Sequence, residues 1–289
     1  MSAVRFDYWG ERVLVTGAAG LIGRALVARF TECGADVVAV DRDADGLKAF
    51  RHVPRVTTVA GDLASEEVAD DVFARLDRAG GLDVLVNNAA ITEVRTPFID
   101  IGTSLWDEVI AANLRSAYLL SVRAVRYWRD EGRGGVIINM SSPGGSRAHD
   151  DQAVYDVAKA GLEALARAIA VELGGRGVRA NCIAPASVVG ETRPATDLPS
   201  GRTTAPEEVA DAALFLASPA AAQLNGHVLR VDGGLHARLR TDPSQEQQRD
   251  AGPPSGPPPS PPPEPPPSPP PGPPPSPPGA SLRWEGSDA

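Results

Sequence analysis

The stretch from Arg12 to Phe30 constrains the fold more than any other part of this chain. An apolar run at residues 12–16 is typical of a buried strand, and a glycine-containing turn, Gly17–Gly23, follows it directly. Apolar residues then recur at helical spacing, at Leu21, Ile22, Ala25, Leu26 and Phe30. A strand, a glycine turn and a helix in this order suit a dinucleotide pyrophosphate, because glycines let the backbone approach phosphates and the helix N-terminus offers free N–H groups. A tight turn with no ligand is the alternative.

Strand-like and helix-like segments alternate through the first 238 residues. This alternation is typical of one doubly wound sheet, so we expect an α/β domain of the Rossmann type, with seven parallel strands and helices on both faces. The expected strands lie near residues 13–16, 37–40, 56–60, 84–87, 136–140, 179–183 and 228–231. We therefore place one dinucleotide-binding domain at residues 1–238.

The remaining residues, 239–289, differ in composition, since 20 of the 28 prolines lie from Pro243 onward. Proline runs cannot donate backbone hydrogen bonds and favour polyproline II, so we predict a disordered tail. A weak ligand for a proline-binding domain is one interpretation. An extended solvated tail is the favoured one, because no basic residue flanks the proline runs at a position that would give specificity.

Charge and composition exclude several classes of protein. A formal net charge of −9 argues against a nucleic-acid partner. No apolar run approaches the ~20 residues that span a membrane, and the first residues lack a signal-peptide core. Two cysteines, Cys33 and Cys182, fall in a predicted helix end and a predicted strand, which favours buried thiols over a disulfide. The four histidines lack ligand spacing, so we expect no metal site, and we expect the protein to be cytoplasmic.

An acidic residue ends the second predicted strand. Asp41 follows the apolar run 37–40, 24 residues after Gly17. A carboxylate there accepts hydrogen bonds from a ribose 2′-hydroxyl and repels a 2′-phosphate, which favours NAD over NADP. Arg42 could serve a phosphate instead, and a loop-capping role for Asp41 is the other alternative.

A tyrosine and a lysine stand four residues apart, at Tyr155 and Lys159. The chain has 28 basic residues, and the only lysines among them are Lys48 and Lys159. Residues at i and i+4 share a helix face, so the ammonium should lie near the phenol and lower its pKa. Tyr155 would then act as a general acid/base. Taken alone, so short a pattern favours an ordinary helix with a surface lysine, and the surrounding motifs reverse that balance.

Together these motifs resemble the short-chain dehydrogenases/reductases, in their single-domain branch, from about Arg12 to Gly234. Further matches follow in the family's order: Asp62-Leu63, Asn87-Asn88-Ala89-Ala90, Asn113, Ser142, Pro185, Thr192 and Val231–Gly234. Ser142 precedes Tyr155 by thirteen residues, which is the family spacing for the catalytic serine.

The resemblance implies an NAD-dependent oxidoreductase that interconverts a secondary alcohol and a ketone, acting as a homodimer or homotetramer. Tyr155 would transfer the proton, Ser142 would hydrogen-bond the substrate oxygen, Lys159 would hold the ribose, and Asn113 would anchor a water linking Lys159 to solvent. The implied cofactor contacts are Gly17, Gly20, Leu21, Ile22, Gly23, Asp41, Asp62, Leu63, Asn88, Tyr155, Lys159, Pro185, Val188 and Thr192.

Some features depart from the family pattern. Pro143 should stiffen the loop after Ser142, and the segment 193–205, usually a longer substrate lid, is short. The loop 145–152 is densely polar, so we expect a small polar alcohol such as a sugar, polyol or hydroxy acid. A non-catalytic dinucleotide sensor or scaffold acting through the tail is an alternative function. An epimerase or dehydratase, suggested by the position of Gly20, is a more remote one.

Overall fold

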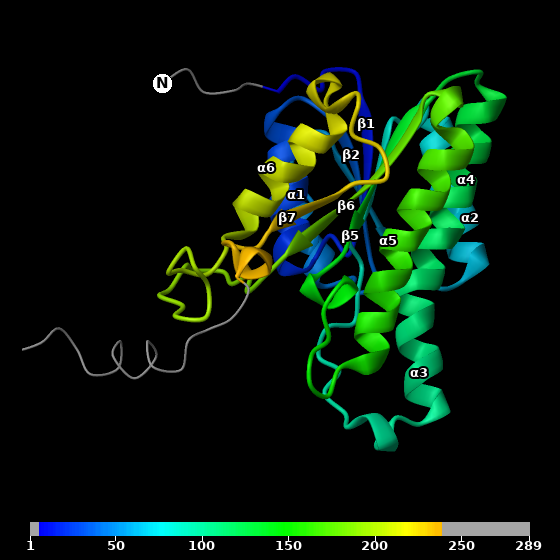
Figure 1. Cartoon of the computed structure of the whole chain (residues 1–289). Helices are drawn as coiled ribbons and strands as arrows, with labels where there is room; N and C mark the ends of the chain where they lie inside the picture. Colours follow the sequence, from blue (N-terminus) through cyan, green and yellow to red (C-terminus); the bar gives the residue numbers. More distant parts are fainter. Residues whose placement is uncertain (1–5, 239–289) are drawn as a thin grey trace, which may run out of the picture. The chain divides into compact units, whose positions relative to one another are not determined.

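A single sheet of seven parallel strands organises the computed structural model, which describes residues 6–238 (Figure 1). The predicted tail, 239–289, lies outside the described residues. The strands are β1 (Arg12–Thr16), β2 (Asp36–Asp41), β3 (Val56–Ala60), β4 (Val84–Asn87), β5 (Gly135–Met140), β6 (Val178–Pro185) and β7 (Val228–Val231). This confirms the predicted doubly wound, Rossmann-type sheet.

The order of the strands places β1 in the middle of the sheet. That order is β3-β2-β1-β4-β5-β6-β7, and β1 pairs in parallel with β2 on one side and β4 on the other, with Leu14 opposite Val38 and Leu85. The chain thus reverses its direction of winding between β1 and β4. In open α/β sheets, ligands bind beyond the carboxyl ends of the strands at such a reversal.

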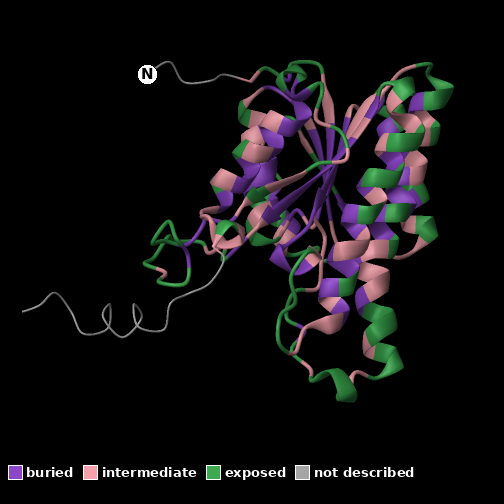
Figure 2. Ribbon diagram, in the orientation of Figure 1, coloured by how far each residue is buried: buried purple, intermediate pink, exposed green. Residues whose placement is uncertain are grey.

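Helices cover both faces of the sheet. In Figure 1, α1 and α6 lie on one face, and α2, α4 and α5 lie on the other. The helices are α1 (Leu21–Glu32), α2 (Glu66–Arg78), α3 (Thr103–Ile110), α4 (Ser116–Asp130), α5 (Ala153–Leu173) and α6 (Pro206–Ala217). Their sheet-facing sides are buried and their outer sides exposed (Figure 2). The strands between them are almost continuously apolar because both of their faces are covered.

The two sides of the sheet have separate apolar cores. Phe30 of α1 and Leu214 of α6 pack against one face, and Leu76 of α2 and Trp128 of α4 pack against the other. Trp128 is fully buried and donates its indole N–H to the Leu82 carbonyl.

Local sequence explains how several helices begin. Ser65 caps α2, accepting the Val68 N–H at 3.4 Å. Pro206 opens α6, and Glu208 reaches back to the Ala205 N–H at 2.8 Å. By contrast, α1 begins after Gly20 with no side-chain cap, which leaves its first N–H groups available to a ligand.

The helical segment that contains Asn113 is not α-helical throughout. Helix α3 ends at Ile110, a π-helical turn follows at Ala111–Arg115, and α4 begins at Ser116. A π-turn holds one residue more than an α-turn and commonly occurs at functional sites. Periodicity alone does not distinguish the two kinds of turn.

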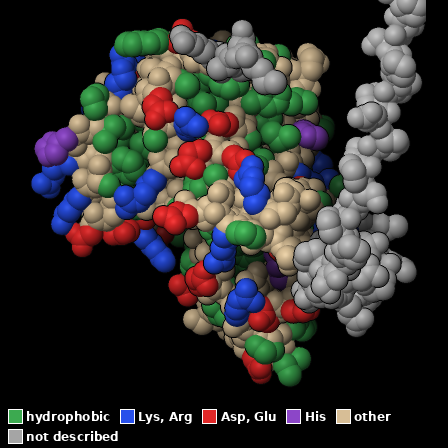
Figure 3. Space-filling model, turned by 90° about the vertical axis from the view of Figure 1, so that its left-hand side faces the viewer, with side chains coloured by type: hydrophobic (Ala, Val, Ile, Leu, Met, Phe, Trp, Pro, Cys, Tyr) green, Lys and Arg blue, Asp and Glu red, His purple; other side chains and the backbone are tan. Residues whose placement is uncertain are grey.

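The outer surface that carries α1 and α6 shows acidic and basic side chains interspersed with apolar ones (Figure 3). In residues 6–238, no helix is both long enough and apolar enough to cross a bilayer.

Candidate active site

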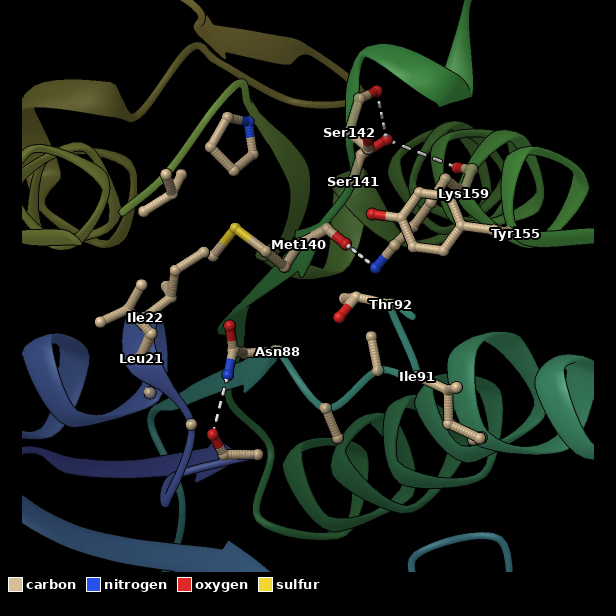
Figure 4. A pocket seen from close by; sticks show the side chains of 18 of the residues that line it. Leu21, Ile22, Asn88, Ile91, Thr92, Met140, Ser141, Ser142, Tyr155 and Lys159 are labelled. Carbon is tan, nitrogen blue, oxygen red and sulfur yellow. Dashed lines mark hydrogen bonds between the residues drawn. The ribbon is translucent and has the colours of Figure 1, made fainter. Parts of the chain in front are cut away.

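A cleft of about 1200 Å³ lies beyond the carboxyl ends of the central strands. It runs from the start of α1 to the Tyr155–Lys159 face of α5 (Figure 4). Apart from Thr192, every residue predicted to contact the cofactor lines it: Gly17, Gly20, Leu21, Ile22, Gly23, Asp41, Asp62, Leu63, Asn88, Tyr155, Lys159, Pro185 and Val188. Ser142 lines it as well.

The glycine turn packs so tightly that side chains are excluded at two positions. Gly17 has φ +64°, and a Cβ there would lie 2.7 Å from the Ala89 Cα. A Cβ on Gly23 would lie 2.0 Å from the Gly17 carbonyl oxygen. At Gly20 a Cβ would meet only that carbonyl, at 3.3 Å. Gly17 and Gly23 therefore hold the turn against α1, while Gly20 leaves open the uncapped helix end, as a bound pyrophosphate requires.

Asp41 connects β2 to the glycine turn. Its Oδ2 accepts the Ala19 N–H and its Oδ1 accepts the Asp43 N–H, both at 2.9 Å. Arg42 and Asp43 line the same end of the cleft. Each carboxylate oxygen has a second lone pair, so Asp41 can accept a ribose hydroxyl while it caps the turn. The loop-capping alternative and the cofactor-binding prediction are thus compatible.

Asn88 and Thr16 join the ends of β4 and β1. The Asn88 amide donates to the carbonyls of Thr16 at 2.9 Å and Gly17 at 3.1 Å. The Thr16 hydroxyl accepts the N–H groups of Asn88 at 2.9 Å and Ala89 at 3.0 Å. Sequence reasoning missed the role of Thr16, although a hydroxyl residue closing an apolar strand was the available signal.

Lys159 is buried at the base of the cleft. Its side chain points under the Tyr155 ring, with Nζ 5.3 Å from the ring centroid, and donates to the Met140 carbonyl at 2.8 Å (Figure 4). The residue is 2% exposed, and burial lowers the pKa of its ammonium to about 8. In the described part of the chain, Met140 is the one acceptor recorded for this ammonium, which carries three donors. The other two can therefore hold ribose hydroxyls.

The prediction that the Lys159 ammonium lowers the pKa of Tyr155 was wrong for the protein without ligand. Burial raises the pKa of Tyr155, and hydrogen bonding to Ser142 opposes this rise only in part. Desolvation disfavours the phenolate, and the ammonium that was expected to offset it points to Met140 instead. Tyr155 is therefore a protonated phenol at neutral pH.

Ser142 has an extended backbone at the end of β5. Its Oγ accepts the Gly144 N–H at 3.2 Å, and Pro143 opens the short 3-10 turn Pro143–Gly145. Proline at the first position fixes its own φ in this turn, and the stiffening of the loop stays a prediction. The Ser142 hydroxyl also lowers the pKa of Tyr155 by hydrogen bonding to it. Both side chains line the cleft, so the Ser142 hydroxyl can turn to donate to a substrate oxygen placed between them.

Asn113 does not line the cleft. It is 1% exposed, and from the π-turn its Oδ1 accepts the Ile91 N–H at 2.7 Å while its Nδ2 donates to the Ile91 carbonyl at 2.9 Å. Asn113 thereby fixes the segment after β4, where Ile91 and Thr92 line the cleft (Figure 4). Its water-anchoring role stays a prediction.

Thr192 is exposed and does not line the cleft, so the structure does not bring it to the position predicted for a cofactor contact. The short segment 193–205 folds back on itself, with Pro194 bridged to Arg202 and the Arg193 N–H donated to the Thr203 Oγ1 at 3.0 Å. Asp197 at its tip lines the cleft.

A histidine-carboxylate pair beside Tyr155 was not predicted. The Nδ1 of His149 lies 2.7 Å from the Asp156 Oδ1, and the His149 N–H donates to the Asp156 Oδ2 at 2.8 Å. The His149 ring lines the cleft at 6.3 Å, centroid to centroid, from the Tyr155 ring. Leu235 lines the cleft too. No sequence signal marked the His149–Asp156 pair or the place of Leu235 in the cleft, because both depend on how loops fold together.

Comparison with known proteins agrees with this geometry. A family model described as enoyl-(acyl carrier protein) reductase matches residues 17–236. D-threitol dehydrogenase of Mycolicibacterium smegmatis is 36% identical over 80% of this chain and 96% of its own length. 3β-Hydroxysteroid dehydrogenase 2 of Eggerthella lenta is 33% identical over 79% of this chain and 95% of its own.

A solved structure is also similar. The 3-ketoacyl-(acyl-carrier-protein) reductase from Brucella melitensis, complexed with NADH, superposes with a TM-score of 0.73 at 29% identity, over 79% of this chain and 99% of that one. The fold, the cleft and these matches lead to one conclusion: the chain belongs to the short-chain dehydrogenase/reductase family and is an oxidoreductase acting on CH–OH groups.

Proposed function

We propose that this protein is an NAD-dependent dehydrogenase that interconverts a secondary alcohol and a ketone, with Tyr155 as the general acid/base. The observation that carries the proposal is the convergence of Ser142, Tyr155 and Lys159 on the cleft that begins at the uncapped helix α1. A dinucleotide-binding sensor has no need of such a set, so the enzyme is favoured over that alternative.

The chain's own residues supply proton transfer and orientation. A nicotinamide dinucleotide bound along the cleft supplies or accepts the hydride. In the reducing direction, Ser142 donates a hydrogen bond to the ketone oxygen and Tyr155 gives its phenolic proton to the same oxygen. The raised pKa of Tyr155, caused by burial, keeps that proton in place at neutral pH. In the oxidising direction the phenol must first lose its proton, so oxidation should accelerate as the pH rises.

The residues at the end of β2 support NAD as the preferred cofactor. Asp41 and Asp43 both line the cleft there. A 2′-phosphate beside such a carboxylate would be repelled by about 2–4 kcal/mol at an effective dielectric near 20. Arg42 lines the same region and would offset part of this. We expect at least about a tenfold preference for NAD in kcat/KM, which requires only ~1.4 kcal/mol.

The walls near Tyr155 support a small polar substrate. Polar and charged groups line this end of the cleft: Thr92, Arg95, His149 and Asp197. A site built of hydrogen-bonding groups rejects ligands that leave those groups unpaired. The relatives do not decide the matter, since one is named for a four-carbon polyol and another for a steroid. We propose a polyol, sugar or hydroxy acid on the basis of the lining.

The decisive test combines a substrate panel with Tyr155→Phe. Purified protein is assayed by NADH absorbance with polyols, sugars, hydroxy acids and bulky apolar alcohols. On the best substrate, Tyr155→Phe should lower kcat by about 10²- to 10⁴-fold, because the proton is lost while the ring still packs. Tyr118 lies on the exposed face of α4, so Tyr118→Phe is the matched control and its kcat should equal that of the parent. Parent-like turnover by Tyr155→Phe would remove the assigned role, and activity on steroids alone would remove the polar-substrate proposal.

A further inference from the structure

Three side chains outside the proposed catalytic set form a continuous hydrogen-bonded chain. Ser146 Oγ lies 2.8 Å from His236 Nε2, and His236 Nδ1 lies 2.8 Å from Asp232 Oδ2. Ser146 belongs to the loop after Ser142, whereas Asp232 and His236 follow β7. The contact therefore joins segments 90 residues apart in the sequence.

Asp232 is the fixed end of this chain. It is 7% exposed, and it also accepts the N–H groups of Gly234 at 3.0 Å and His236 at 2.9 Å. These hydrogen bonds lower its pKa against the opposing effect of burial. The carboxylate thus stays ionised and orients the His236 ring toward the loop. A hydroxyl both donates and accepts, so Ser146 can pair with either tautomer of the histidine.

A serine, histidine and aspartate so arranged also describe an activated nucleophile. Two observations argue against that function here. The N–H groups of Ser146 and Arg147 both donate to the Pro143 carbonyl, at 3.1 and 2.9 Å, so neither is available to stabilise an oxyanion. Ser146 is also exposed and does not line the cleft. The arrangement suits holding two segments together.

Further contacts connect the same segments. The Arg147 guanidinium donates to the Leu235 carbonyl at 3.1 Å. We call residues 232–238 the C-terminal strap. On its other side the strap contacts the segment 193–205, since Arg238 donates to the Asp197 carbonyl at 3.1 Å and the Ser200 N–H donates to the Gly233 carbonyl at 2.9 Å. In Figure 1 the orange strap lies beside that yellow-green segment.

Each of these three segments contributes a wall of the cleft. Pro143 and His149 line it from the loop after β5, Leu235 from the strap and Asp197 from the short lid segment. We propose that Ser146, His236 and Asp232 are positioning residues that clamp the 143–149 loop to the C-terminal strap and thereby set substrate affinity at this end of the cleft. The effect on substrate affinity rests on the proposed function, whereas the clamp between the two segments does not.

The kinetic test uses variants of the full chain. His236→Ala and Ser146→Ala should each raise the substrate KM by about three- to tenfold, the range expected from one hydrogen bond, while the KM for NAD stays within about twofold. The double variant should be no worse than the worse single variant, because both remove the same contact. Ser146→Thr keeps a hydroxyl and should restore the parent value. His227→Ala is the matched control, since the His227 side chain is exposed and its recorded contacts are made by its backbone.

A second measurement does not depend on activity. Trypsin cleavage after Arg147 requires local opening of the loop, so the fragment ending at Arg147 should appear about three- to tenfold faster in His236→Ala and Ser146→Ala. It should appear at the parent rate in His227→Ala. An inactive parent with these cleavage rates would overturn the proposed function and leave the clamp intact.

Three results would overturn the clamp. One is cleavage at Arg147 and a substrate KM that match the parent in both alanine variants. Another is an equal rise in the KM for NAD and for substrate, which would indicate general loosening. The third is a burst of p-nitrophenol from p-nitrophenyl acetate that is abolished by Ser146→Ala, which would make Ser146 a nucleophile.

Discussion

Replacing Lys159 by methionine should make the cofactor-free protein more stable at neutral pH. Burial lowers the pKa of this lysine from 10.5 to about 8. One pKa unit corresponds to about 1.4 kcal/mol, so the charged ammonium destabilises the folded state by about 3 kcal/mol at pH 7. Methionine removes that charge but leaves the Met140 carbonyl without its donor, which costs about 1–3 kcal/mol. The net gain should be about 0–2 kcal/mol.

The change of this stability difference with pH tests the reasoning more directly than its value at one pH. Between pH 8 and 10.5 the unfolded lysine binds a proton that the folded one has lost, so the stability of the parent rises with pH in that window. The penalty is complete below pH 8 and absent above pH 10.5. From pH 7 to 9.5 the parent should therefore gain about 2 kcal/mol relative to Lys159→Met. Groups common to both proteins cancel in this difference.

The assay is urea unfolding of the apo-protein at pH 7 and pH 9.5, for the parent, Lys159→Met and Lys48→Met. Lys48→Met is the control, because Lys48 is exposed and pairs with Asp45 at 2.6 Å, where exposed ion pairs contribute ~0–1 kcal/mol. The reasoning would be refuted if Lys159→Met were destabilised equally at both pH values. That result would mean that the lysine is solvated or paired in solution.

Other outcomes follow from the same contacts. Asp41→Asn should reduce the NAD preference by about tenfold in kcat/KM, measured with both cofactors, and an unchanged ratio would leave the preference to other residues. Gly23→Ala should destabilise the fold by about 1–3 kcal/mol and weaken NAD binding, because its Cβ would lie 2.0 Å from a carbonyl oxygen; parent-like values in denaturation and calorimetry would contradict this. A chain ending at Arg238 should turn over like the full chain, whereas one ending at Val231 lacks the strap and should lose substrate affinity. Equal kinetics for the two truncations would contradict the strap's role.

Features that depend on neighbouring residues in the sequence were predictable. The strands were found because buried parallel strands are short apolar runs, and the glycine turn because strand, glycines and helix are contiguous. The spacing of Tyr155 and Lys159 placed both side chains on one face of α5, and both line the cleft. Asp41 was recognised from its position at the end of an apolar strand.

Features that depend on burial or loop packing were not predictable. The pKa of Tyr155 is set by how deeply the ring is covered, and spacing carries no such information. The His149–Asp156 pair and the Ser146–His236 contact need loops to fold onto other elements. Thr192 was placed by resemblance, but the short lid segment pairs with itself and leaves it exposed.

The π-helical turn at Ala111–Arg115 affects how this region tolerates insertions and deletions. Deleting one residue there would restore an uninterrupted α-helix and improve its local regularity. Because the turn holds one residue more than an α-turn, this deletion would leave the flanking helices α3 and α4 close to their present orientation and shift the residues of the turn itself. Asn113 would then leave the Ile91 backbone, to which it donates and from which it accepts. A more regular helix at this point would therefore hold the segment after β4 less firmly than the π-turn does.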